Sequence, residues 1–322
     1  MPRLSMQSAT PVRASLLPLL VAALCTGTAA TARNDPATFG IEQVASGVFV
    51  HVGKAVALDA PGHDDIANIG FIAGKRCVAV IDTGGSVRIG RALRAAIRRH
   101  SSLPVCYVIN THVHVDHVLG NAAFRDDGPR FVGHALLADA LIRSRDFFLG
   151  NYAADFDAPP TAAEIIGPDI RVPLGTDLTL DLGERALTLH AWPTAHTDCD
   201  LTVYDSRSRT IWTGDLLFIQ RTPVLDGSVK GWLSAIESLA GTEVRHVIPG
   251  HGPVADDLAA ALAPERRYLQ MLLADVSAEV ARGEPLQQAI REPDPVEKAN
   301  WVLWEQAHRH NIARAYQELE WQ

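Results

Sequence analysis

The stretch Thr111-His112-Val113-His114-Val115-Asp116-His117 dominates the interpretation of this sequence. It follows the apolar run Val105 to Ile109 and gathers three imidazoles and a carboxylate. Keeping these groups together is costly unless their lone pairs find a partner, which a metal ion supplies. Histidines at positions i and i+2 do not share a helix face, so we expect His112 and His114 on extended or turning backbone. The cluster therefore predicts a metal-binding loop at the end of a strand.

Three later stretches carry further candidate ligands. They are Ala195-His196-Thr197-Asp198, Thr213-Gly214-Asp215 and Pro249-Gly250-His251-Gly252. Each follows a run with the apolar pattern of a strand, and residues that leave strands at one edge of a layered protein converge in space. We therefore expect His196, Asp215 and His251 to join the first cluster.

The sequence around these stretches predicts a layered α/β protein. Alternation over Ile41–Val52 and apolar runs at Ile69–Ala73 and Val78–Asp82 indicate strands, and Val87–His100 has helical spacing before the strand Val105–Ile109. The second half repeats this plan, with strands near 171–172, 177–180, 186–191, 201–204, 210–213 and 246–248 and a helix at about 229–239. Strand–helix–strand units in two similar halves favour two packed sheets with helices outside.

The ends of the chain differ from its middle. Residues 1–32 combine Arg3 and Arg13 with the apolar run Ala14–Leu24 and an Ala30-Thr31-Ala32 cleavage pattern, which is typical of a signal peptide, a retained anchor being the alternative. We expect a periplasmic or secreted protein without stable membrane insertion. Residues 33–255 would form the main domain and residues 256–322 a helical extension packed on it, whose stripe at Trp301, Trp304 and His308 is interpreted as packing alone.

Composition narrows the class of partner. The chain of 322 residues is 47% hydrophobic, enough for an extensive core, and its 29 basic and 37 acidic residues form no long run of either sign. We therefore expect a small-molecule substrate and no nucleic acid. Outside the signal peptide the cysteines are Cys77, Cys106 and Cys199. We expect Cys77 and Cys106 to be buried inert thiols, and whether any pair forms a disulfide stays open.

From Ile41 to Gly252 the chain resembles the metallo-β-lactamase superfamily, whose five motifs occur in order. The resemblance implies an α/β fold of the αββα sandwich type and a binuclear centre. It implies one metal ion on His112, His114 and His196, the other on Asp116, His117 and His251, Asp215 as a bridge and Asp82 as a carboxylate that orients the histidines. Nitrogen and carboxylate ligands suit two Zn²⁺ ions per chain, and the same ligand types also bind iron or manganese.

Such a centre predicts hydrolysis. Two metal ions about 3.5–4 Å apart share a water whose pKa falls to roughly 7, giving a hydroxide nucleophile for an ester, thioester or lactone-like carbonyl. Asp116 or Asp215 would relay the proton as the catalytic carboxylate. In the superfamily a bridging carboxylate such as Asp215 is typical of glyoxalase II and lactonase relatives, which makes a β-lactamase the weaker expectation. The glutathione-binding signature of glyoxalase II is not evident after His251.

Three segments carry a narrower resemblance. Residues 191–200, 214–228 and 300–321 resemble the exported SoxH-type or quinoprotein relay system zinc metallohydrolases, which implies association with a periplasmic sulfur- or PQQ-dependent oxidation system. Two alternatives belong to other classes: a mononuclear iron dioxygenase acting on persulfides, and a periplasmic accessory protein that binds metal without catalysis. Metal analysis would separate the first alternative from the hydrolase.

Residues that contact the substrate are harder to identify from sequence. Arg221 is a candidate for binding a substrate carboxylate, and Trp192, Tyr152 and His63 are candidates for lining a pocket. Cys199 and His134 are candidates for hydrogen bonding to the metal ligands. For each of these residues ordinary core packing or a solvated surface position is the competing interpretation.

Overall fold

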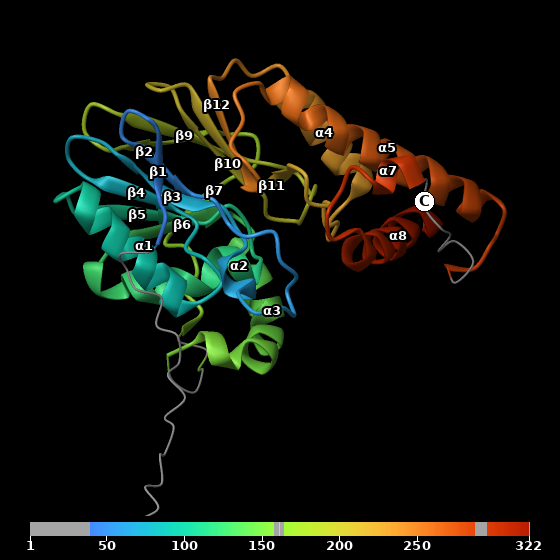
Figure 1. The fold of residues 1–322 in the computed structure, drawn as a ribbon, viewed down its shortest axis with the longest axis horizontal. Helices are drawn as coiled ribbons and strands as arrows, with labels where there is room; N and C mark the ends of the chain where they lie inside the picture. The colour runs from blue at the N-terminus through green and yellow to red at the C-terminus, as the bar shows by residue number, and fades with distance from the viewer. Residues whose placement is uncertain (1–38, 158–160, 162–163, 287–294, 322) are drawn as a thin grey trace, which may run out of the picture. The chain divides into compact units, whose positions relative to one another are not determined.

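The computed structural model describes residues 39–157, 161, 164–286 and 295–321. The expected signal peptide at 1–32 lies outside them, as do Pro293 and Asp294. Within the described residues two β-sheets pack face to face with helices on their outer sides (Figure 1). This is the αββα sandwich expected from the sequence, and helices follow it at the C-terminal end, so the predicted fold class is confirmed.

The first sheet has seven strands in sequential order. They are β1 (Glu42–Ala45), β2 (Val48–His51), β3 (Ile69–Ala73), β4 (Val78–Ile81), β5 (Val105–Ile109), β6 (Arg130–His134) and β7 (Ile170–Val172). The first four pair antiparallel, whereas β4 to β7 run parallel. Helix α1 (Val87–His100) makes the crossover between β4 and β5, and Ser86 caps its N-terminus by accepting a hydrogen bond from the Ile89 amide. The carboxyl ends of β4 and β5 therefore meet at one edge.

The second sheet has the order β12-β11-β10-β9-β8. Its strands are β8 (Leu178–Asp181), β9 (Ala186–Ala191), β10 (Leu201–Asp205), β11 (Thr210–Phe218) and β12 (His246–His251). Only β11 and β12 pair in parallel, joined by helix α4 (Val229–Leu239). Apolar side chains from both sheets, including Val50, Ile81, Leu189 and Trp212, fill the space between them. Burial of this kind stabilises the sandwich by about 25 cal/mol per Å² of apolar surface.

Short elements join the strands near the edge where the candidate ligands lie. They are the 3₁₀ segments His63–Asp65, Leu119–Asp127 and Ala153–Asp155 and the helices α2 (Val115–Val118) and α3 (Leu137–Asn151). Helix α2 begins directly after His114, so Asp116 and His117 lie in its single turn. The residues before it turn without regular structure, as the spacing of His112 and His114 requires.

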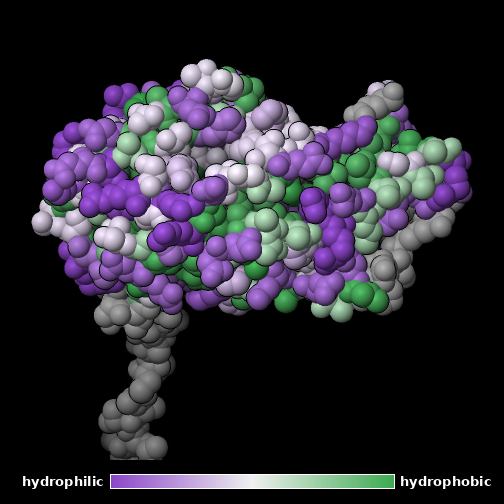
Figure 2. All heavy atoms as spheres, turned by 90° about the horizontal axis from the view of Figure 1, so that it is seen from above, coloured by the Kyte–Doolittle hydropathy of each residue, from purple (hydrophilic) through white to green (hydrophobic). Residues whose placement is uncertain are grey.

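Three C-terminal helices complete the described chain: α5 (Leu258–Ala281), α7 (Pro295–Lys298) and α8 (Trp304–Glu320). The apolar faces of α5 and α8 share one core with α4 and β11, in which Trp232, Tyr268, Trp301 and Trp304 are buried. Among the described residues no helix is long and apolar enough to cross a membrane. Hydrophobic and hydrophilic residues are intermixed on the face drawn in Figure 2.

Several elements differ from the sequence prediction. The expected strand Ile41–Val52 is a hairpin of two strands, because Gly47 at a φ of 70° turns the chain between them. Strand β6 and helix α3 had no prediction. Strands β11 and β12 continue beyond Thr213 and Ile248, since their pairing extends with register shifts to Phe218 and His251. Asp215 and His251 consequently lie within their strands instead of beyond them.

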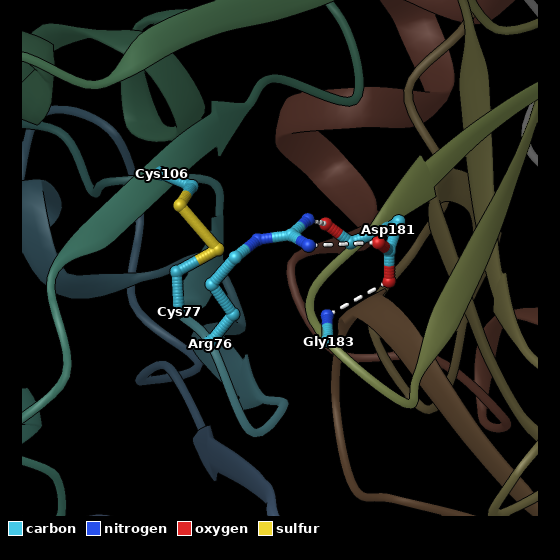
Figure 3. The surroundings of a disulfide bond; sticks show 5 residues. All are labelled: Arg76, Cys77, Cys106, Asp181 and Gly183. Carbon is cyan, nitrogen blue, oxygen red and sulfur yellow. Dashed lines mark hydrogen bonds and ion pairs between the residues drawn. A yellow bond between two sulfur atoms is a disulfide. The ribbon is translucent and has the colours of Figure 1, made fainter.

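Cys77 and Cys106 form a disulfide, which corrects the expectation of two inert thiols. Cys77 precedes β4 and Cys106 lies in β5, and the register of these neighbouring strands brings the two Cα atoms to 5.7 Å, within the range that a disulfide bridges. Figure 3 shows the bond beside Arg76, which pairs with Asp181, the last residue of β8 in the second sheet. Cys199 is a buried free thiol.

Candidate metal centre

Seven histidine and aspartate side chains converge at one edge of the sandwich. The loop after β5 and helix α2 supply four of them, the loop after β9 supplies one, and β11 and β12 supply one each. Asn68 fastens the two sheets at this edge, because its side chain donates to the carbonyls of Pro249 and Gly252 at 2.8 Å each. The fold thus brings together residues that are far apart in the sequence.

The first group contains His112, His114, His196 and Asp215, whose ligand-type atoms all lie within 4.8 Å of one another. Nε2 of His196 lies 3.0 Å from Nδ1 of His114. Oδ2 of Asp215 lies 3.5 Å from Nε2 of His196 and 3.7 Å from Nε2 of His112. These atoms surround a common point, as the ligands of a metal ion do.

The second group contains Asp116, His117 and His251. Oδ2 of Asp116 lies 3.3 Å from Nε2 of His251 and 3.6 Å from Nε2 of His117. Asp215 also reaches this group, with 3.1 Å from its Oδ1 to Nε2 of His117 and 3.2 Å from its Oδ2 to Nε2 of His251. The carboxylate of Asp215 therefore stands between the two groups.

The inward-facing atoms suit divalent metal ions. Nε2 of His112, Nε2 of His117 and Oδ1 of Asp215 are buried and have no hydrogen-bond partner of acceptable geometry, although they lie close to one another. Buried polar atoms without partners are unfavourable, and a cation that accepts their lone pairs removes that cost. Gly250 keeps the space open, because a Cβ there would lie 1.9 Å from Oδ1 of Asp215.

Asp82 orients the first ligand stretch. One of its oxygens accepts from the backbone amide of Thr111 at 2.8 Å, and the other accepts from the Thr111 hydroxyl at 2.7 Å and from Nδ1 of His117 at 2.8 Å. The same hydroxyl lies 3.0 Å from Nδ1 of His112. One carboxylate thus fixes, directly or through Thr111, which ring nitrogen of His117 and His112 faces inward.

The remaining histidines are oriented by backbone carbonyls and by Asp226. Nδ1 of His196 donates to the Val224 carbonyl at 2.6 Å, and Nδ1 of His251 donates to the Ile66 carbonyl at 2.8 Å. Nε2 of His114 lies 2.8 Å from Oδ2 of Asp226. Each imidazole therefore keeps one nitrogen for the centre and binds protein with the other, as metal-ligating histidines do.

A pocket of about 1000 Å³ opens onto both groups. Its floor includes His114, Asp116, Asp215 and His251. Its walls come from the turn before His63, from α3, from the 222–228 loop and from α8, and include Leu58, Phe147, Phe148, Tyr152, Arg221, His310 and Arg314. A pocket of this volume accommodates a small molecule.

Comparison with protein families gives a match to the metallo-β-lactamase superfamily over residues 63–251, which spans more than half of the chain. The chain belongs to this superfamily. Membership places it among metal-dependent hydrolases and agrees with the two groups of His and Asp side chains. A comparison with curated proteins gave no match. Helices α5, α7 and α8 lie beyond the matched region.

Solved structures of this superfamily share the fold. A metallo-β-lactamase from Pontibacter korlensis is similar with a TM-score of 0.58 and 22% identity, over 72% of this chain and 98% of that one. A metallo-β-lactamase from Hirschia baltica gives 0.55 and 18%, over 71% and 96%. A stereoselective inverting sec-alkylsulfatase from Pseudomonas sp. gives 0.65 and 16%, over 87% of this chain and 50% of that one.

Burial and mutual charge set the protonation of the candidate ligands in this chain. Burial lowers the pKa of His196 to about 4, and His114 adds to that shift. Burial acts to raise the pKa of Asp215, but His251 and His117 outweigh it and hold that pKa well below its usual range. A neutral imidazole at His196 and an ionised carboxylate at Asp215 are the forms that bind a metal ion.

Two of the residues predicted to contact substrate line the pocket, and two do not. Arg221 and Tyr152 are part of the lining. Trp192 instead lies in the core, where its indole N–H donates to Thr202, and Thr194 takes its place at the pocket. His63 turns toward Asp155, with 3.1 Å between Nε2 and Oδ2, because the preceding turn presents Leu58 and Asp59 to the pocket instead.

His134 and Cys199 were candidates for hydrogen bonding to the ligands, with core packing as the competing interpretation, and within the described chain neither has a hydrogen bond to one. Nδ1 of His134 accepts from the Leu136 amide, so this buried imidazole completes the turn into α3. The Cys199 thiol packs among apolar residues and contacts the Thr197 hydroxyl at 3.6 Å. Burial raises the pKa of Cys199, which keeps it protonated and unsuited to metal binding.

Sequence reasoning predicted the C-terminal helix but missed the contacts that Asp226 and the polar face of α8 make at the site. Asp226 lies in the segment quoted for the narrower resemblance, but its role depends on a turn that places it beside His114. The interpretation of the C-terminal stripe as packing alone holds for Trp301, Trp304 and His308, whereas His310 and Arg314 on the same helix line the pocket. Their spacing of four residues is the signal that could have identified a second, polar face of α8.

Proposed function

We propose that this chain is a binuclear zinc hydrolase that acts on an ester, thioester or lactone-like carbonyl. The observation that carries the proposal is Asp215, whose carboxylate lies within 3.7 Å of a nitrogen of His112, His117, His196 and His251. A carboxylate shared in this way suits two cations side by side. Structural zinc sites are usually closed cages of four ligands, whereas these groups open onto a pocket.

His112, His114 and His196 would hold one Zn²⁺ ion, and Asp116, His117 and His251 the other, with Asp215 between them. Ions held there would lower the pKa of a bound water to about 7 and polarise a carbonyl oxygen. Asp116 lines the pocket floor, so its carboxylate would accept a proton and return it to the leaving group. No serine or cysteine nucleophile is required, in agreement with the buried, protonated thiol of Cys199.

The environment of Arg221 favours a substrate that carries an anionic group. Its side chain lines the pocket, its exposed fraction is 8%, and within the described residues it forms no ion pair with a carboxylate. Its Nη1 lies 3.2 Å from Nδ1 of His251, but that nitrogen donates to Ile66 and offers no lone pair. A buried guanidinium without an acceptor is costly, and a substrate carboxylate would satisfy it.

A second part of the pocket wall favours an apolar group on the same substrate. Leu58, Phe147, Phe148 and Tyr152 line it, and Leu58 and Phe147 are exposed at the surface. Aromatic side chains in such a wall contribute large contact areas to a bound acyl or aryl group. The substrate class that fits both walls is an ester or thioester with an apolar portion and a carboxylate.

Export is part of the proposal. The disulfide between Cys77 and Cys106 supports it, because disulfides persist in oxidising compartments such as the periplasm. The signal-peptide pattern of residues 1–32 and the SoxH-like segments favour a place beside a periplasmic oxidation system. Fractionation of cells that make the full chain tests this, since a cytoplasmic, uncleaved product contradicts export.

Metal quantification on the mature protein, followed by a substrate screen, tests the activity. About two zinc ions per chain and hydrolysis of carboxylate-bearing esters are the expected results. One iron ion with oxygen consumption on persulfides would establish the dioxygenase alternative instead. Metal binding without turnover of any ester, thioester, lactone or β-lactam would favour an accessory role.

A further inference from the structure

Helix α8 lies outside the region that matches the superfamily, yet it holds a loop that orients two candidate ligands. The loop comprises residues 222–228, the last part of the connection from β11 to α4. The Asn311 side chain on α8 is buried and forms two hydrogen bonds with the backbone of this loop. Its amide nitrogen donates to the Pro223 carbonyl at 2.7 Å, and its oxygen accepts from the Leu225 amide at 2.8 Å.

Two more side chains of α8 extend the contact along the loop. Arg314 donates to the backbone carbonyl of Asp226. Glu318 accepts from the Ser228 hydroxyl at 2.6 Å and from the Val229 amide at 2.7 Å. The loop is therefore held by α8 from Pro223 to the first residue of α4, which fixes its position relative to the sheets.

The same loop carries the hydrogen-bond partners of two histidines in the first group. The Val224 carbonyl accepts from Nδ1 of His196 at 2.6 Å, and Oδ2 of Asp226 lies 2.8 Å from Nε2 of His114. The other oxygen of Asp226 lies 2.7 Å from Nε2 of His310 on α8. The Asp226 carboxylate is thus shared between a candidate ligand and the C-terminal helix.

We infer that α8 determines the geometry of the first metal site, because it holds the loop that orients His114 and His196. His310 is then a positioning residue for this site. By contacting the Asp226 oxygen that does not face His114, His310 limits the rotation of that carboxylate and with it the orientation of the His114 ring. Partners that orient metal-binding histidines commonly change metal affinity by 10–100-fold when they are removed. The inference rests on the proposed function only in taking His114 as a metal ligand.

The second group has a different set of supports. His117 is oriented by Asp82, and His251 by the carbonyl of Ile66. Neither Asp82 nor Ile66 has a hydrogen bond to α8 among the described residues. A change at His310 is therefore expected to weaken one metal site and to leave the other unchanged, a selectivity that general destabilisation of the fold would not produce.

His310 is suited to the test because its side chain is partly exposed and lies outside the apolar core. The measurement is a titration of metal-free protein with Zn²⁺ against a competing chelator, which gives two dissociation constants, together with the visible absorption of the Co²⁺-loaded protein. His310→Ala should raise one constant roughly tenfold and leave the other within a factor of two. His310→Gln, which can donate to Asp226, should restore most of the affinity.

Arg309→Ala is the matched control, because Arg309 is the neighbouring exposed residue on α8 and does not line the pocket. It should bind both ions as the wild type does. Unchanged constants and an unchanged Co²⁺ spectrum in His310→Ala would overturn the inference. So would an equal weakening of both sites combined with a lower melting temperature of the metal-free protein. If the wild type itself binds no metal ion, the proposed function fails first.

Discussion

The Asp82 carboxylate accepts a hydrogen bond from Nδ1 of His117 over 2.8 Å, and both residues are buried. This bond leaves Nε2 of His117 as the atom that faces Asp215. Asp82 adopts a φ of 52°, a conformation that Asn tolerates better than most residues. The geometry therefore permits a substitution that removes the charge and spares the backbone.

Asp82→Asn should weaken metal binding by roughly 10–100-fold, because a neutral amide orients His117 less firmly than a carboxylate. Metal content after dialysis against a chelator measures the effect, and kcat should fall in proportion to the metal lost. Asp256→Asn, at an exposed carboxylate, serves as the control. Full metal content in Asp82→Asn would show that this bond does not support the centre.

Gly250→Ala should damage the centre without removing any ligand. The added Cβ would lie 1.9 Å from Oδ1 of Asp215, so the carboxylate must move. Displacements of about 1 Å at a reacting centre cost on the order of 100-fold in rate. The expected result is a loss of that size in kcat/KM, whereas Gly241→Ala, with no atom closer than 4.0 Å, should be nearly silent. Equal activity of the two variants contradicts the prediction.

Arg221→Met should separate charged from neutral substrates. A hydrogen bond to a charged group contributes about 1.5–3 kcal/mol, or roughly 10–100-fold in affinity. We expect KM to rise by that factor for an ester that carries a carboxylate and to change little for its uncharged amide or methyl analogue. Arg221→Lys tests whether the charge alone suffices. The same rise in KM for both substrates would assign Arg221 to packing.

Removal of the disulfide should lower stability and leave the centre intact. The bond closes a loop with a sequence separation of 29, and such crosslinks contribute about 2–4 kcal/mol to the free energy of unfolding. Urea unfolding of Cys77→Ala/Cys106→Ala measures the loss. Metal stoichiometry should stay at the wild-type value because neither cysteine is near a ligand group. A loss of bound metal would contradict this separation of roles.

His308 should contribute to the dependence of stability on pH. Burial between Tyr268 and Trp304 lowers the pKa of His308 to about 4, against about 6.5 in the unfolded chain. Below pH 6.5 the unfolded state binds the proton more readily, so this contribution is complete above pH 6.5 and is lost as the pH falls toward 4. Metal-free His308→Phe should lose less stability than metal-free wild type between pH 6.5 and 4, as measured by urea unfolding. An identical slope in both proteins would contradict the assignment.

The candidate ligands that are neighbours in the sequence could be predicted from the sequence alone. His112, His114 and His117 stand within one short stretch after a buried strand, and such a cluster has few physical explanations other than metal binding. The αββα sandwich followed from strands and helices whose periodicity is plain, such as Val87–His100. Joining His196, Asp215 and His251 to the cluster relied on the superfamily resemblance as well as on their positions near strand ends.

The parts that could not be predicted depend on tertiary placement. The pairing of Cys77 with Cys106 requires the register of β4 against β5, which local patterns do not specify. Helix α3 buries only a few of its residues and exposes Ile142 and Phe147, so no continuous apolar stripe marks it. The bond between Asp226 and His310 joins residues 84 positions apart and has no sequence signature.

The pocket walls have a consequence for how this protein can evolve. Leu58 and the α3 residues Phe147 and Phe148 belong to elements that contribute none of the seven candidate ligands. Mutations there can alter which molecules enter the pocket while the candidate ligands keep their geometry. Natural selection can therefore change the substrate specificity of the enzyme in small steps, and each step preserves activity.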